Sequence, residues 1–332
     1  MTAAPAVTVV MPVYNGGPFV GEAIESILRQ SFTNFEFVII DDASTDDTPD
    51  IIASFTDTRI RFLRNESRLG YPQSPNRALA VAKGEFVARQ DADDRSHPDR
   101  LAAEVAFLRA NPEVALVGTQ VRVIDKRGRI SRPPAWWRAT TETGIRFQSL
   151  FDNPFVHSSV VFRREVVGSY DETFTTADDF ELWSRIAAAH SVRNLPQALL
   201  DLRMHTGSMG TSYGAEHIAR SSAVLARNLR GAIGEVPDAW CRLLAELHLD
   251  PGARENIDGS EVLAVLSNIY ERFGEKTAEV REIMARKLAD IACSFAPSQR
   301  CAAIAAFARA CRCDLRAASS FATRFFGRLA LP

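Results

Sequence analysis

Two aspartates separated by one residue, Asp91 and Asp93, follow a short apolar run at residues 85–88. Carboxylate oxygens are the ligands that hard divalent cations prefer, and a bound cation stabilises negative charge that develops on a leaving diphosphate. An Asp-Ala-Asp turn also occurs as a solvated acidic loop, and the motif alone does not separate these interpretations. Its place after a strand favours a ligand site, because α/β sheets bind ligands at the carboxyl ends of their strands.

A second pair of carboxylates, Asp178 and Asp179, opens a segment with helical spacing. The positive end of a helix favours an ionised aspartate, and an ionised carboxylate can take a proton from a hydroxyl group. Simple capping of the helix by Asp178 is the alternative, and it leaves Asp179 available for chemistry. The sequence therefore predicts Asp179 as a general base.

Alternating strands and helices must position these side chains. Strands are predicted at 7–13, 35–40, 60–63, 85–88, 114–123 and 158–162, and helices at 19–30, 76–82, 98–110 and 179–189. Continuous apolar strands between helices indicate an α/β fold with a mostly parallel, Rossmann-like sheet covered on both faces. Asp42 follows the second strand and Asp91 the fourth, so we expect these carboxylates at the same edge of the sheet.

Composition indicates an ordinary globular protein. The chain has 332 residues and a net charge of -2, so nothing in its charge favours nucleic acid. Residues 1–21 lack charged side chains, but Pro, Asn and Gly residues interrupt the run, and no stretch is long enough to span a membrane. We therefore expect a cytoplasmic protein. Its five cysteines do not suggest a disulfide framework or a zinc site.

The chain changes character near residue 215, which suggests a catalytic domain at 1–215 and a helical region at 216–332. From Arg286 to Pro332 there are eight Lys or Arg residues against two Asp, with phenylalanines interleaved. Such helices can lie on an anionic membrane surface, which predicts peripheral contact with the inner face of the cytoplasmic membrane. The alternative is a basic helical face that packs on the catalytic domain or on a second subunit.

Several short motifs occur in a fixed order over roughly residues 6–212, and together they resemble the family-2 glycosyltransferases of the GT-A fold. The motifs are VVMPVYN at 9–15, IESILRQSF at 24–32, FVIIDDASTD at 37–46, AKGEFVA at 82–88, DADD at 91–94, HSS at 157–159, DDFELW at 178–183 and LRMH at 202–205. Each motif is loose, but their order and spacing are specific. The resemblance implies a GT-A fold with a C-terminal helical appendage.

The resemblance also implies how a nucleotide binds. Pro12 and Tyr14, with Asn15 beside them, would line the base and ribose. Asp42 would hydrogen-bond the base, typically a uracil, so a UDP-sugar is the favoured donor. Arg68 would touch the nucleotide, although a solvated surface position explains this residue equally well.

Further family positions would handle the diphosphate and a Mn²⁺ or Mg²⁺ ion. Asp91 and Ala92 would face the ribose and diphosphate, and Asp93 would bind the metal with Asp91. Arg203 and His205 lie where the family often contacts the donor diphosphate or the metal.

Asp179 matches the catalytic base of the family, and Asp178 replaces the glutamate that usually precedes it. One base without a nucleophile implies inversion at the anomeric carbon. The acceptor would be a saccharide or a lipid-linked sugar, in the assembly of bacterial surface polysaccharide or glycolipid.

Three other classes of protein are alternatives to a glycosyltransferase. A sugar-nucleotide nucleotidyltransferase is disfavoured because the first loop, 14–18, is not followed by a basic residue until Arg29. A dehydrogenase is disfavoured because no GxGxxG follows the first strand. A non-catalytic nucleotide-binding or scaffold protein with the same fold remains open, although Asp42, Asp93 and Asp179 argue against it.

Overall fold

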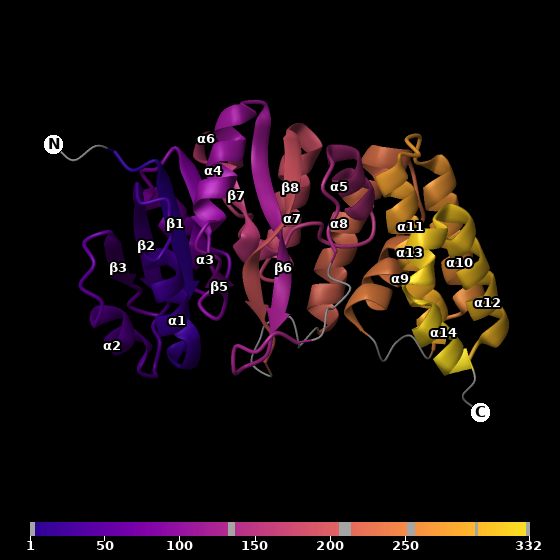
Figure 1. Cartoon of the computed structure of the whole chain (residues 1–332), viewed down its shortest axis with the longest axis horizontal. Helices are drawn as coiled ribbons and strands as arrows, with labels where there is room; N and C mark the ends of the chain where they lie inside the picture. Colours follow the sequence, from indigo (N-terminus) through magenta and orange to yellow (C-terminus); the bar gives the residue numbers. More distant parts are fainter. Residues whose placement is uncertain (1–3, 132–136, 206–213, 251–255, 296–297, 330–332) are drawn as a thin grey trace. The chain divides into compact units, whose positions relative to one another are not determined.

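The computed structural model describes residues 4–131, 137–205, 214–250, 256–295 and 298–329 (Figure 1). Contacts between residues divide the chain into two compact units. The sheet unit comprises residues 1–140 and 153–212, and the helical unit comprises residues 141–152 and 213–332. The sequence-based division near residue 215 differs from these units in one segment, 141–152, which groups with the C-terminal helices.

The sheet unit is built on eight strands in the order β3-β2-β1-β4-β7-β6-β8-β5. The strands are β1 Val7–Val13, β2 Phe35–Asp41, β3 Ile60–Arg64, β4 Phe86–Arg89, β5 Arg95–Ser96, β6 Val114–Ile124, β7 Val161–Arg163 and β8 Ser191–Arg203. The first four strands in this order are parallel, as the sequence predicted. Every residue of β1 is buried, which is why this strand is a nearly continuous apolar run.

Pro12 lies inside β1, although proline cannot donate a hydrogen bond to a neighbouring strand. The pairing of β1 with β4 covers only Val7 to Val10, so at Pro12 the strand is paired with β2 alone. The missing N–H therefore falls where β4 has already diverged from the sheet ladder.

The other half of the sheet is mixed and contains the two strands that the sequence did not predict, β5 and β8. β7 is antiparallel to β4 and β6, β6 is parallel to β8, and β5 is antiparallel to β8. In β8, Leu195 pairs with Thr119 and Ala198 pairs with Gln120, so Pro196 and Gln197 form a bulge. The bulge breaks the apolar alternation by which a strand is identified in sequence.

Helices flank the sheet and complete its core. In the sheet unit they are α1 Gly17–Leu28, α2 Thr48–Ala53, α3 Gln73–Val81, α4 Arg100–Ala110, α6 Arg164–Val167 and α7 Asp178–Ala189, with a short 3-10 turn, η1, at His157–Ser159. Ile24 of α1 and Leu108 of α4 join Val9 and Met11 of β1 in one buried cluster. This packing fixes the carboxyl ends of the strands and the loops that follow them.

The helical unit contains α5 Glu142–Gln148, α8 Ala215–Ile233, α9 Asp238–Leu249, α10 Gly259–Arg272, α11 Ala278–Phe295, α12 Arg300–Cys313, α13 Leu315–Ser319 and α14 Ala322–Leu329. Phe147 of α5 is fully buried and its ring lies 4.9 Å from Phe273 and 6.1 Å from Tyr270. At the other end of α5, the backbone N–H of Thr141 donates to Glu279 of α11 at 3.0 Å. These contacts place α5 in the helical unit, although it interrupts the sequence of the sheet unit.

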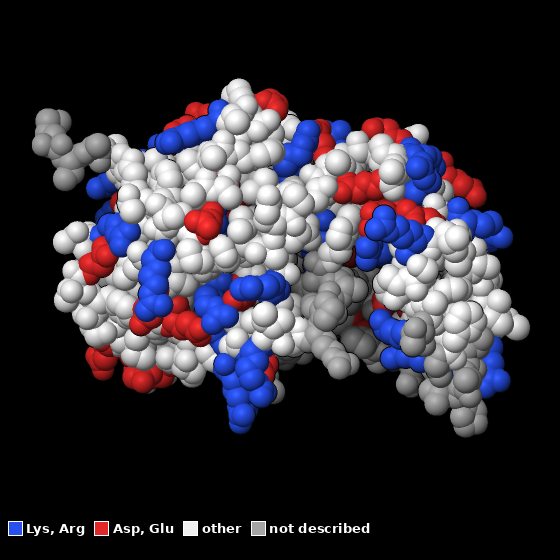
Figure 2. Space-filling model, in the orientation of Figure 1, with Lys and Arg blue, Asp and Glu red and all other residues white. Residues whose placement is uncertain are grey.

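No helix among the described residues is long and apolar enough to cross a membrane. Figure 2 shows both basic and acidic side chains on the visible face.

Candidate active site

Three non-glycine residues with positive φ lie in loops at the carboxyl edge of the sheet or beside the predicted base. Asn15 follows β1, Ala43 follows β2, and Ala177 immediately precedes α7, with φ values of 51°, 61° and 57°. Such backbone costs free energy for residues other than glycine and is concentrated at functional sites. Asn15 and Ala43 belong to motifs that the sequence analysis singled out, and Ala177 directly precedes the DDFELW motif, so the three residues mark this edge as the candidate site.

The loop after β4 carries three carboxylates in different environments. Asp94 is only 2% exposed, and it accepts hydrogen bonds from the backbone N–H of Arg203 at 2.8 Å and from the Ser158 hydroxyl. The side chains of Asp91 and Asp93 keep 28% and 31% of their surface exposed. Asp94 therefore anchors the loop, and Asp91 and Asp93 remain partly buried and partly exposed.

Asp91 forms an ion pair with Arg89, whose Nη2 lies 2.9 Å from the carboxylate. Burial raises the pKa of Asp91 to about 6, and the charges of Asp93 and Asp179 add to this rise while Arg89 opposes it. Asp93 and Asp179 thus lie within electrostatic range of Asp91. The two motifs that the sequence identified separately converge on one site.

Asp93 and His205 form the pair best suited to a divalent cation. The Nε2 atom of His205 lies 3.1 Å from Oδ2 of Asp93, and the Phe19 ring supports the imidazole at a centroid distance of 4.8 Å. The described residues contain no group of three or more His, Cys, Asp or Glu side chains arranged to hold a metal, so Asp91 does not join this pair. One carboxylate and one imidazole fit an ion that keeps waters and takes its remaining ligands from substrate phosphates.

Arg203 is placed differently from the sequence prediction of a diphosphate contact. It is 2% exposed, and its Nε donates to the carbonyl of Asp93 at 2.7 Å while Nη1 donates to the carbonyl of Asp125 at 3.2 Å. In this structure the guanidinium holds the loop of Asp93 from within the protein.

The predicted base lies at the N-terminus of α7, and its two carboxylates differ in exposure. Asp178 is 7% exposed, and burial together with the charge of Asp179 raises its pKa to about 8. Asp179 is more exposed; it accepts a hydrogen bond from the Asn153 side chain at 2.9 Å and one from the Phe180 N–H at 2.7 Å. Burial also raises the pKa of Asp179, but these donors and Arg89 oppose the rise. A proton shared by the pair is therefore favoured on Asp178, which leaves Asp179 ionised.

The residues predicted to bind the base of the nucleotide lie in or near the loops after β1 and β2. The guanidinium of Arg68 lies 3.9 Å from the centroid of the Tyr14 ring, and both side chains are exposed. Asn15 joins the two loops, because its backbone N–H donates to Ser44 and its side chain accepts from the Thr45 N–H, each at 2.9 Å.

Asp42 holds the next loop in place. Its carboxylate accepts hydrogen bonds from Asn65 at 2.6 Å, from the Leu69 N–H at 2.9 Å and from the Gly70 N–H at 2.7 Å. Burial alone would raise the pKa of Asp42, but these donors lower it below its usual value. Asp42 is therefore ionised and buried beside Arg68, where it fixes the loop that presents this arginine.

Ala92 connects the two halves of the site. A Cβ built on Gly16 would lie 3.5 Å from the Cβ of Ala92 and 2.6 Å from Val13. The loops after β1 and β4 are therefore close enough for ordinary van der Waals contact at Ala92, and it is Val13 that leaves Gly16 no room for a side chain.

The sequence analysis missed Arg89, a fully buried arginine at the end of β4. Its Nε donates to Nε2 of His157 at 2.9 Å, so this imidazole is neutral, and burial and Arg89 hold the pKa of His157 well below its usual value. The available signal was a charged residue at the end of an otherwise apolar strand. Arg89 supplies a fixed positive charge beneath Asp91, Asp178 and Asp179.

Comparison with known proteins gives one family. Residues 8–170 match the family model described as glycosyl transferase family 2. EpsE of Bacillus subtilis is 34% identical over 212 residues, which cover 61% of this chain and 74% of EpsE.

Solved structures agree in fold. The structure of S. aureus TarS 1–349 in complex with UDP-GlcNAc matches with a TM-score of 0.60 and 18% identity, over 90% of this chain and 88% of that one. The mannosyltransferase PcManGT from Pyrobaculum calidifontis, in complex with GDP-Man and Mn²⁺, matches with a TM-score of 0.54 and 26% identity, over 80% and 75% of the two chains. The predicted GT-A fold is confirmed.

Proposed function

The chain belongs to glycosyl transferase family 2, and from this premise we propose that it is an inverting enzyme whose base is Asp179 and whose metal ligands are Asp93 and His205. It transfers a sugar from a nucleoside-diphosphate sugar to an acceptor hydroxyl. The observation that carries the proposal is the contact of Asp93 with His205 at 3.1 Å in the loop after β4, where Arg89 also pairs with Asp91 at 2.9 Å.

The base acts by a single displacement. Asp179 takes the proton of the acceptor hydroxyl while that oxygen attacks the anomeric carbon, and the bond from this carbon to the diphosphate breaks with its electron pair. Asn153 fixes the orientation of the carboxylate, and the protonated Asp178 leaves the negative charge on Asp179. With one base and no covalent intermediate, the configuration at the anomeric carbon is inverted.

The donor diphosphate lies beside Asp93 and His205 in this proposal. A divalent cation bound there neutralises negative charge on the leaving diphosphate. Mn²⁺ is the favoured ion, since PcManGT binds it together with GDP-Man, and Mg²⁺ is the alternative. Asp91 stays paired with Arg89 and faces the ribose, which revises its predicted role as a ligand.

In this proposal the nucleotide base and ribose contact Tyr14, Pro12 and Arg68. A UDP-sugar remains the favoured donor, and TarS was solved with UDP-GlcNAc. The acceptor is a saccharide or a lipid-linked sugar, in the synthesis of surface polysaccharide or glycolipid.

A lipid-linked acceptor also suits the C-terminal helices. Leu315 of α13 and Phe326 of α14 are 67% and 59% exposed, and Arg312, Arg316 and Arg324 are exposed on the same short stretch of chain. Exposed apolar side chains among arginines favour binding to an anionic membrane surface.

Calorimetric titration with UDP and GDP, with and without Mn²⁺, tests the proposal. We expect Mn²⁺-dependent binding of one nucleotide, loss of the metal dependence in Asp93→Ala, and normal binding in Asp179→Asn. Absence of binding by either nucleotide under both conditions would refute the proposal and support the scaffold alternative.

A further inference from the structure

Arg203 connects both proposed metal ligands, although it lies too deep to touch solvent freely. Its Nε holds the carbonyl of Asp93 at 2.7 Å, and it ends β8 two residues before His205. Its guanidinium also lies over the Phe19 ring at 4.8 Å, and the same ring packs against His205. Arg203 therefore holds the main chain of Asp93 directly. It also contacts the Phe19 ring that supports His205.

Glu22 of α1 supplies a negative charge to this buried arginine. Its Oε2 accepts a hydrogen bond from Nη2 of Arg203, while the Asp93 and Asp125 partners of Arg203 are neutral carbonyl oxygens. A buried guanidinium that loses its counter-charge moves toward water or draws another carboxylate to it. Asp93 is such a carboxylate, and a shift of this kind would remove it from His205.

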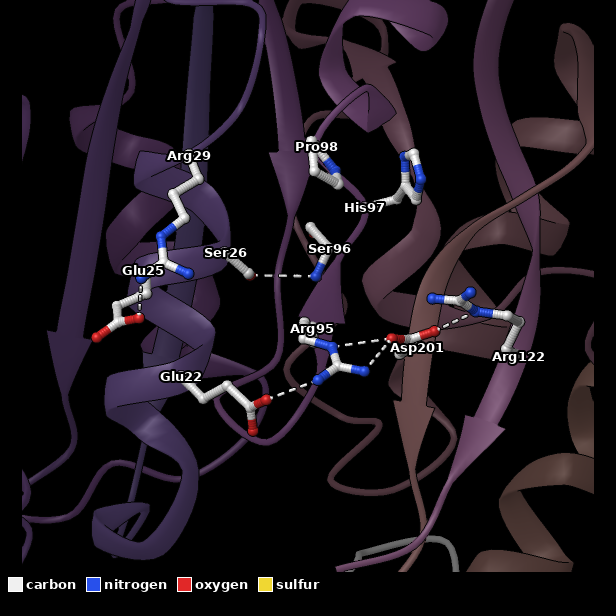
Figure 3. Close-up of a pocket in the computed structure, with 10 residues that line it drawn as sticks. All are labelled: Glu22, Glu25, Ser26, Arg29, Arg95, Ser96, His97, Pro98, Arg122 and Asp201. Atoms are coloured by element: carbon white, nitrogen blue, oxygen red, sulfur yellow. Dashed lines mark hydrogen bonds and ion pairs between the residues drawn. The ribbon is translucent and has the colours of Figure 1, made fainter. Parts of the chain in front are cut away.

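Glu22 is itself held by a row of ion pairs that continues outward (Figure 3). Its Oε1 accepts from Nη1 of Arg95 at 2.9 Å, and Arg95 donates to Oδ2 of Asp201 at 2.6 and 2.9 Å. Arg122 donates to the other oxygen of Asp201 at 2.6 Å. Figure 3 shows Asp201 between the two arginines, on the wall of a cavity of about 270 Å³.

The row combines two buried side chains with three that are more exposed. Arg203 and Asp201 are 2% and 3% exposed, whereas the side chains of Glu22, Arg95 and Arg122 are 42%, 34% and 44% exposed. Water and salt screen the exposed partner of each pair, so the Arg122 and Glu22 pairs do not differ in exposure. They differ in what the buried partner holds, because Arg203 donates to the carbonyl of Asp93. The contact between Glu22 and Arg203 is the one that bears on the site.

We propose that Glu22 is a positioning residue for the metal site, acting through Arg203 on Asp93 and His205. The inference rests on the proposed function, because it assumes that Asp93 and His205 bind the cation. No atom of Glu22 is proposed to contact the substrate or the metal.

The chain offers a matched control three residues away. Glu25 is on the same helix, lines the same cavity and forms an ion pair of 2.6 Å with Arg29, but both side chains are largely exposed and neither contacts Arg203 in this structure. Glu22→Gln and Glu25→Gln therefore remove the same charge from the same helix. Glu22→Asp retains the charge but withdraws it from Arg203.

The experiment measures Mn²⁺ binding directly by calorimetry, with protein saturated by UDP or GDP, whichever binds. We expect Glu22→Gln to weaken Mn²⁺ binding about tenfold or more, as is typical when a group behind a metal ligand is removed. Glu22→Asp should lose less, and Glu25→Gln should stay within about twofold of the unmodified protein. Circular dichroism and thermal unfolding confirm that the variants remain folded, and Glu22→Asp serves if Glu22→Gln does not fold.

Asp93→Asn separates the two ways in which the inference can fail. If Asp93→Asn loses Mn²⁺ binding while Glu22→Gln and Glu22→Asp match Glu25→Gln, the positioning role of Glu22 is wrong and the proposed metal site stands. If Asp93→Asn binds Mn²⁺ as tightly as the unmodified protein, the proposed metal site is wrong, and the inference falls with it.

Discussion

The sheet unit and the helical unit bury different kinds of side chain. Among the described residues, every buried Asp, Glu or Arg except Asp152 lies in the sheet unit: Asp41, Asp42, Arg89, Asp94, Arg100, Glu104, Asp178, Glu181, Asp201 and Arg203. The helical unit instead buries Leu, Val, Ile, Ala and Phe side chains, and its one buried carboxylate pairs with Lys287.

Burying charge is costly unless each group is paired, so a fold without a chemical task gains little from it. Five of the ten buried charges of the sheet unit lie in or beside the site loops: Asp42, Arg89, Asp94, Asp178 and Arg203. The buried charged residues near the site therefore lie in the sheet unit, whereas the helical unit buries mainly apolar side chains that pack together. Four sets of substitutions test this difference between the two units.

The largest effect is expected from Asp179→Asn, which removes the proposed base but keeps its shape. We expect kcat to fall by about 10³-fold, or about 4 kcal/mol of transition-state stabilisation, since the amide cannot accept the proton. The melting temperature should stay close to that of the unmodified protein, because asparagine keeps a side-chain oxygen that can accept from the Phe180 N–H. Steady-state kinetics measures kcat, and calorimetry measures nucleotide binding. Full activity in this variant would show that Asp179 is not the general base.

Phe147→Ala tests the opposite unit. The ring is fully buried against Phe151, Tyr270 and Phe273, so its loss should cost about 3–5 kcal/mol of unfolding free energy. Nucleotide affinity should change less than about twofold if the helical unit only packs. Phe326→Ala is the control, because that side chain is 59% exposed and its removal should cost far less. Denaturant unfolding and calorimetry distinguish these outcomes.

The Glu104→Gln substitution tests how a buried charged residue of the sheet unit makes stability depend on pH. Glu104 lies 3.8 Å from Arg100, both are fully buried, and burial raises the pKa of Glu104 from 4.5 to about 8 although Arg100 opposes the rise. The folded protein therefore keeps a proton that the unfolded chain releases, so the stability due to this group is present below pH 4.5 and is lost as pH rises toward 8.

Glutamine imitates the protonated acid and does not titrate. We expect the variant and the unmodified protein to be equally stable near pH 5, and the variant to be more stable by roughly 1–4 kcal/mol at about pH 8. Urea unfolding at these pH values measures the difference. Parallel curves for the two proteins would show that Glu104 is ionised in the fold throughout.

The smallest effect concerns the exposed end of the helical unit. Leu315→Ser combined with Phe326→Ser should weaken binding to vesicles of anionic lipid by about tenfold, since two apolar side chains no longer enter the interface. Ile130→Ser, which removes an exposed apolar residue of the sheet unit, is the control. If the unmodified protein, the double variant and Ile130→Ser cosediment equally with the vesicles, the proposed membrane contact of the helical unit is wrong.

The order of elements followed from local pattern, because a buried strand must be apolar and its flanking turns must be polar. The predicted strand 7–13 matches β1, and the predicted helix 179–189 differs from α7 by one residue. β8 was missed because Pro196 and Gln197 bulge out of its ladder. The placement of 141–152 was missed because its partners, such as Glu279, lie more than a hundred residues away.

Local sequence patterns were enough to identify the strand-end carboxylates and, through the family motifs, the expected site residues Asp42, Asp91, Asp93, Asp179 and His205. Residue type and strand-end position are local properties, which a pattern in one chain can express. The three-dimensional contacts were needed to see that Arg89 pairs with Asp91, that Asp94 is an anchor, and that the buried Arg203 pairs with Glu22. These roles depend on which side chains are buried together, and burial is set by contacts between segments far apart in the chain.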